Sequence, residues 1–152
     1  MRSRFFGMAP LAACLLLAGC SDGGGATSTN PHDALFSPPS QATRTPDSIF
    51  GVWGGSAAGG VLDVRMHITP DRMVVANRCH FGETTVTAGV TSSIAVTDED
   101  ITVFESDDDI VPFGDLECRA SLRPGQMSYQ LDGTRLTFSE GKEELSLVKI
   151  RD

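Results

Sequence analysis

Side chains that could carry out catalysis are few in this sequence. The imidazoles are His32, His67 and His80, and no Gly-x-Ser-x-Gly segment marks an activated serine. His80 follows Cys79 and lies three positions before Glu83, a combination that can bind zinc, but no second histidine or cysteine lies at ligand spacing. The carboxylates occur in runs rather than as isolated pairs. We therefore expect a non-enzymatic protein with no metal site and no cofactor other than a covalent lipid.

The segment before Cys20 has the features of a secretory signal. Arg2 and Arg4 precede an uncharged, mostly apolar run over residues 5–19. This run is shorter than the roughly 18 or more residues that a membrane-spanning helix needs. We expect residues 1–19 to be a signal peptide that is removed from the mature protein.

Residues 17–20, Leu-Ala-Gly-Cys, resemble the lipobox of bacterial lipoproteins. The resemblance implies that a diacylglyceryl group is attached to the Cys20 thiol, that a peptidase cuts just before this cysteine, and that the new amino terminus is acylated, for example with palmitate. Two or three acyl chains give stable anchoring, whereas one chain does not. In that family an aspartate after the cysteine favours the inner membrane, so Ser21 indicates an outer-membrane lipoprotein that faces the periplasm.

Residues 20–48 are rich in Ser, Thr, Pro and Gly, with Leu35 and Phe36 as their only large apolar residues. Such a composition buries too little apolar surface to offset the entropy of ordering the chain. It predicts a flexible tether with a root-mean-square span of roughly 30 Å. Residues 49–152 then remain to fold, which is enough for one small domain.

From residue 49 onward, apolar and polar residues alternate with a period of two. Tight turns such as Pro70-Asp71 and Asp132-Gly133 separate the alternating segments. Short strands are expected over residues 61–69, 73–79, 84–91, 93–97, 101–105, 116–122, 126–131, 134–138 and 143–150. The pattern predicts an all-β domain, either a small antiparallel meander barrel of about eight strands or, alternatively, a β-sandwich.

Gly51 and Trp53 form a Gly-x-Trp motif at the start of this pattern, which resembles the first strand of lipocalin-like barrels. The resemblance implies that Trp53 plugs the closed end of a barrel whose interior can hold a ligand. The Thr-Asp-x-x-Tyr element of that family is absent, because Thr97-Asp98 is not followed by a tyrosine at that spacing. Residues expected to contact a ligand or to form the core are Trp53, Val64 and Met66.

Cys79 and Cys118 are the two cysteines of the folded part. An even pair in a small β domain of the oxidising periplasm predicts a disulfide. Both cysteines lie at inward-alternating positions of expected strands, which favours a structural bond over a reactive thiol. Closing a loop of about 40 residues would contribute roughly 4 kcal/mol to stability in the chain-entropy model.

The chain is acidic, with 20 acidic and 12 basic residues. A chain without clustered Lys and Arg is not expected to bind nucleic acid. Residues 98–117 contain nine acidic residues and no basic one. Two solvated loops that keep sheet edges from pairing would explain this segment. A face for a basic protein partner is the other interpretation, and its candidate residues are Asp98, Glu99, Asp100, Asp107, Asp108 and Asp109.

These observations predict a lipid-anchored, non-enzymatic envelope protein whose barrel binds a small apolar ligand or another envelope protein. The alternative is a periplasmic inhibitor that presents residues 98–117 to a basic hydrolase such as lysozyme.

Overall fold

The computed structural model describes residues 30–38 and 41–152. The predicted signal peptide and Cys20 lie outside the described residues. Among the described residues, no helix has the length and apolar character needed to cross a membrane. The elements are η1 (Pro31–Phe36), β1 (Gly51–Ala57), η2 (Ala58–Gly60), β2 (Leu62–Ile68), β3 (Arg72–Phe81), β4 (Thr84–Val96), β5 (Asp100–Val103), β6 (Asp107–Phe113), β7 (Leu116–Leu122), β8 (Gly125–Asp132), β9 (Arg135–Glu140) and β10 (Glu143–Arg151).

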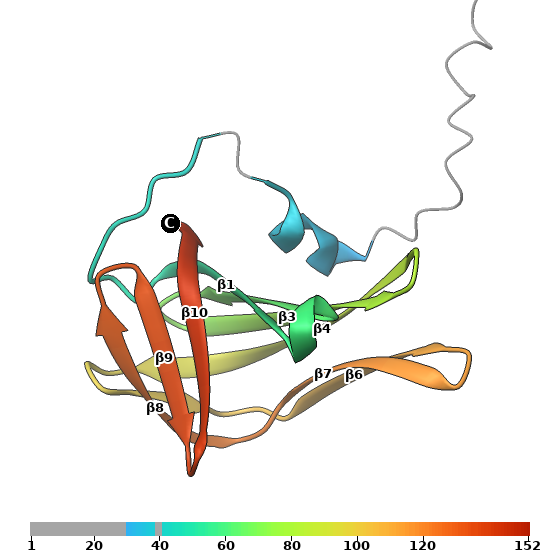
Figure 1. Ribbon diagram of the computed structural model, residues 1–152. Coiled ribbons are helices and arrows are strands. Elements are labelled where there is room, and N and C mark those ends of the chain that lie inside the picture. Colours follow the sequence, from blue (N-terminus) through green and yellow to red (C-terminus); the bar gives the residue numbers. More distant parts are fainter. Residues whose placement is uncertain (1–29, 39–40) are drawn as a thin grey trace, which may run out of the picture.

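Eight strands close into an antiparallel barrel in the order β1-β10-β9-β8-β5-β4-β3-β2 (Figure 1). The predicted all-β class and the predicted barrel are confirmed, and the alternative sandwich does not form. Inward positions recur at every second residue of each strand, so that side chains from the whole wall meet in one core. The largest fully buried hydrophobic side chains include Trp53, Ile68, Met73, Ile101, Leu136 and Leu147.

The strand pattern differs from the prediction in β4. This strand is continuous over 13 residues, whereas the sequence pattern predicts a break at Ser92. Ser92 is buried, and its hydroxyl donates to the carbonyl of Glu105 at 3.1 Å. A polar residue in the middle of the strand therefore bonds to a neighbouring segment instead of forming a turn. Most of β4 pairs with β3, and only residues 94–96 pair with β5.

The second difference is β6, which forms within a stretch expected to be a solvated loop. β6 and β7 pair with each other as a separate two-stranded sheet that extends beyond the barrel (Figure 1). The inward side chains of β7 are Cys118, Ala120 and Leu122, all of which belong to the main core. The hairpin β6–β7 is therefore packed on the barrel through one face.

Residues 43–48 contact the end of the barrel at which the β8–β9 turn and the C-terminus lie. The amide of Asp152 donates to the carbonyl of Thr43 at 2.8 Å. Asp47 and Gly133 exchange two hydrogen bonds, both of 2.9 Å. We call this end of the barrel the closed end, and we call the opposite end, at the β9–β10 turn, the open end.

The helix η1 lies over the outer face of β2–β4 (Figure 1). Its Asp33 carboxylate accepts hydrogen bonds from Arg78 Nη2 at 2.9 Å and from Thr87 Oγ1 at 2.6 Å. The Phe36 ring centre lies 4.0 Å from the guanidinium carbon of Arg78, a cation–π contact. These contacts attach residues 30–38 to the barrel, which the composition of the predicted tether does not indicate.

Candidate functional site

The closed end of the barrel is filled by side chains. Trp53 is fully buried there, and its indole N–H donates to the carbonyl of Ile49 at 2.7 Å. The ammonium of Lys149 lies 5.3 Å from the centre of the Trp53 ring and donates to the carbonyls of Thr45 and Ser48, both at 2.8 Å. Trp53 is therefore a core residue of this end, with its polar atom satisfied.

A pocket of about 420 Å³ lies at the open end, within the size range of small-molecule sites. Its lining comprises Met66, Gln126, Met127, Phe138, Ser139, Glu140, Glu143, Glu144 and Leu145. Met66 is the cross-strand partner of Trp53, so the pocket reaches the level of Trp53 in the barrel wall. The three residues predicted to contact a ligand or form the core, Trp53, Val64 and Met66, are all buried in the core, and Met66 also lines the pocket.

The apolar part of the pocket comes from four strands. Met66 lies on β2, Met127 on β8, and Phe138 on β9, where it stacks edge-on against Tyr129 with ring centres 6.5 Å apart. Leu145 adds a partly exposed side chain from β10. Two thioethers beside an aromatic ring give a polarisable surface that adapts to apolar ligands of different shapes.

The mouth of the pocket carries carboxylates. Glu140, Glu143 and Glu144 are exposed at the β9–β10 turn and line the pocket. Sequence reasoning did not select them, because the alternation of β9 and β10 shows which residues face inward but not which turn lies at the open end.

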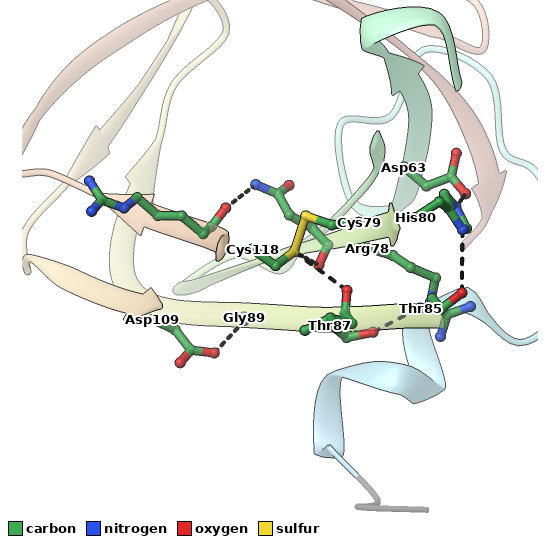
Figure 2. The surroundings of a disulfide bond; sticks show 12 residues. Asp63, Arg78, Cys79, His80, Thr85, Thr87, Gly89, Asp109 and Cys118 are labelled. Carbon is green, nitrogen blue, oxygen red and sulfur yellow. Dashed lines mark hydrogen bonds and ion pairs between the residues drawn. A yellow bond between two sulfur atoms is a disulfide. The ribbon is translucent and has the colours of Figure 1, made fainter. Parts of the chain in front are cut away.

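The predicted disulfide is confirmed. Cys79 on β3 and Cys118 on β7 are bonded, with Cα atoms 5.7 Å apart (Figure 2). Asn77 supports the same junction, because its side-chain amide donates to the carbonyl of Arg119 at 2.8 Å. The hairpin β6–β7 is thus linked covalently to the barrel wall near the open end, and neither sulfur is a free thiol.

Carboxylates of the acidic segment bind the backbone edge of β4 that β5 leaves unpaired. Asp109 accepts from the amide of Gly89 at 2.8 Å (Figure 2), and Asp107 accepts from the amide of Thr91 at 2.9 Å. These two residues alternate along β6, so their side chains lie on the same face of that strand. Side-chain acceptors therefore take the place that a neighbouring strand would occupy, and β6 masks the edge of β4.

The other acidic candidates have different environments. Asp100 accepts hydrogen bonds from Gln126 at 2.9 Å and Ser128 at 2.7 Å. Asp108 lies 3.6 Å from Arg123. Asp98 and Glu99 are exposed in the turn before β5. The six predicted residues thus do not form one uniform face, and three of them bond to the barrel itself.

His80, which the sequence analysis considered as a metal ligand, is paired with Asp63. The Nε2 atom of His80 lies 2.9 Å from Asp63 Oδ2 (Figure 2). Ser56 donates to the same carboxylate at 2.7 Å. The hydrogen bond from Ser56 and then that from His80 hold the pKa of Asp63 below its usual value. Nδ1 lies 3.4 Å from the Thr85 hydroxyl, on an exposed strand face. No cluster of three or more metal-ligating side chains was found in residues 30–38 and 41–152.

Comparison with known proteins gave no match to a protein-family model, to a curated protein or to a solved structure. The function of this chain is therefore argued from its own residues.

Proposed function

We propose that this chain is a lipid-anchored envelope protein, without enzymatic activity, whose barrel binds a small apolar ligand in the pocket at the open end. The observation that carries the proposal is the pocket of about 420 Å³ with Met66, Met127, Phe138 and Leu145 in its lining. Concave, largely apolar sites with a few polar groups at the rim are typical of small-molecule binding.

A second hollow is less suited to an apolar ligand. A groove of about 580 Å³ is lined by residues of η1, β3, β4 and β6. Most of its lining is polar, namely Asn30, Asp33, Arg78, Thr85 and Thr87. Asp33, Arg78 and Thr87 already bond to one another. An apolar ligand would gain contacts only with Val86 and Val111 there, so the pocket at the open end is the better site.

The anchoring half of the proposal predicts that Cys20→Ser abolishes lipid attachment. The thiol is the only side chain of the resembling segment that can be alkylated in the way the lipobox implies. Metabolic labelling with a fatty acid and fractionation of cells expressing the full chain measure the effect. We expect label and membrane association in the unaltered chain and neither in Cys20→Ser, and a variant that stays with the outer membrane would contradict the anchor.

The binding half predicts that 4-phenylbutanol, a neutral probe, enters the pocket. The full chain in lipid nanodiscs, labelled with ¹³C at the methionine methyl groups, is titrated with the probe and followed by NMR. Signals of Met66 and Met127, assigned with Met→Leu variants, should shift in a saturable way. The signal of Met73, which is fully buried at the closed end, should not.

Binding of this kind depends little on salt, because apolar contacts carry no screened charge. Met127→Gln should weaken the binding about tenfold, because a polar amide would have to lose water on ligand entry. Equal shifts at all three methionines, or shifts that also occur with the lipid alone, would contradict a pocket at the open end.

The inhibitor hypothesis has less support. A basic hydrolase would need free carboxylates, but Asp107 and Asp109 accept hydrogen bonds from β4 and Asp100 from β8. Replacing residues 107–109 together would therefore disturb the edge of β4 as well as any partner face. Asp98, Glu99 and Asp108 are better positions for testing this hypothesis. Asp98 and Glu99 are exposed, and Asp108 pairs with the side chain of Arg123 rather than with the backbone of β4.

A further inference from the structure

We propose that the ligand of the open-end pocket is a cationic amphiphile, that is, a small molecule with an apolar body and an ammonium group. The inference rests on the proposed function of the same pocket and adds the chemical class of the ligand. The apolar body would lie on Met66, Met127 and Phe138, and the ammonium group would lie between Glu140 and Glu143.

The first observation is the register of the β9–β10 hairpin. Glu140 and Glu143 are directly paired across it. Glu140 lies two residues after the buried Phe138, and Glu143 lies two residues before Leu145, so both glutamates share the face that lines the pocket. Directly opposite residues in an antiparallel pair have Cβ atoms about 4.5–5.5 Å apart, and like charges there are destabilising. An ammonium group between the two carboxylates would remove that repulsion.

The second observation is the sign of the charges around the pocket. Its described lining contains three carboxylates and no basic side chain. Among residues 30–38 and 41–152, Glu140, Glu143 and Glu144 form none of the five ion pairs; these involve Asp33, Asp63, Glu117, Asp108 and Asp152. Lys142 lies in the turn between Glu140 and Glu143 but is not part of the lining. An anionic head group would meet only like charge at this mouth, whereas an ammonium group would donate charge-assisted hydrogen bonds.

The third observation separates an organic cation from a metal ion. The described residues contain no group of three or more carboxylate, imidazole or thiol side chains that converge on one point. Calcium needs six to eight oxygen ligands around one point, whereas the three glutamates of the lining do not converge in this way. A metal ion would make no contact with the apolar side chains beside the carboxylates. An amphiphile would contact both the apolar side chains and the carboxylates.

The test compares three probes of the same shape and different charge. They are 4-phenylbutylamine, 4-phenylbutanol and 4-phenylbutyrate, each titrated into the full chain in nanodiscs while the methyl signals of Met66 and Met127 are followed. Empty nanodiscs correct for partition into lipid. We expect the amine to reach half-saturation at a concentration about tenfold lower than the alcohol, and the acid to bind more weakly than both.

The variant Glu140→Gln/Glu143→Gln should abolish the difference between amine and alcohol while the alcohol still binds. It removes a repulsive pair, so it is not expected to unfold the barrel. Glu83→Gln/Glu99→Gln makes the same charge change at exposed positions outside the pocket and should keep the preference for the amine.

Equal affinity for amine and alcohol in the unaltered chain would overturn the charge inference but leave the pocket. A preference for the acid, or a preference for the amine that persists in Glu140→Gln/Glu143→Gln, would also overturn it. Failure of all three probes to shift Met66 and Met127 would remove the proposed function and this inference together.

Discussion

Replacing Cys79 and Cys118 together with alanine should lower the free energy of unfolding by about 4 kcal/mol. The bond closes a loop with a sequence separation of 39, and cross-linking such a loop removes many conformations from the unfolded chain. The bonded hairpin also supplies Ala120 and Leu122 to the main core, so its loss would affect the barrel as a whole. A loss of this size is a large share of the 5–15 kcal/mol typical of small domains.

Chemical denaturation followed by the fluorescence of Trp53, the only tryptophan, measures this effect. The unaltered chain under reducing conditions is the matched control, because it keeps both sulfur atoms and lacks only the bond. We expect the reduced chain and the alanine variant to unfold at similar, lower denaturant concentrations. A transition at the same concentration as in the oxidised protein would show that the disulfide does not contribute to the stability of the barrel.

Lys149→Met should lower the free energy of unfolding by about 3 kcal/mol. The Lys149 side chain is fully buried, donates to two carbonyl groups and lies 3.2 Å from the carboxylate of Asp152. Methionine fills a similar volume but leaves those acceptors without their donor, and buried acceptors without a partner are costly. Residues 43–48 would also lose a main attachment to the barrel.

Lys142→Met is the matched control, since Lys142 is the other lysine of the chain and is exposed in the β9–β10 turn. We expect a change within about 0.5 kcal/mol for this control. Denaturation curves give the stability, and limited proteolysis reports whether residues 43–48 become accessible in Lys149→Met. Equal stability of the two variants would mean that the ammonium group of Lys149 contributes nothing to the free energy of unfolding beyond the packing of the Lys149 side chain.

The alternation of apolar and polar residues was sufficient to predict the barrel. It located β2, β8 and β9 closely, because each has one face in the core and one in solvent. It also placed Cys79 and Cys118 on inward positions. The same alternation contained a signal that was not used: Leu145 and Leu147 lead to Lys149, and a lysine at an inward position indicates a buried, bonded ammonium group.

The features that were not predicted depend on contacts between distant segments. β6 contains three consecutive aspartates, a composition that local rules assign to a loop, but Asp107 and Asp109 bond to backbone amides of β4. Of the pocket lining, only Met66 was among the predicted residues, because Met66, Met127 and Phe138 come together only after the barrel closes. The pairing of Glu140 with Glu143 requires the exact turn of the hairpin, which composition alone does not give.

The docking of η1 on the barrel would limit how far the proposed lipid anchor at Cys20 lets the domain lie from a membrane. If Cys20 carries the lipid, as proposed, only residues 21–29 separate the anchor from Asn30, whose side chain donates to the carbonyl of Thr87 on β4. Nine residues span at most about 32 Å even when fully extended. The barrel would then stay within roughly one domain diameter of the bilayer. At that distance, the open-end pocket would be within reach of molecules that leave or enter the lipid surface.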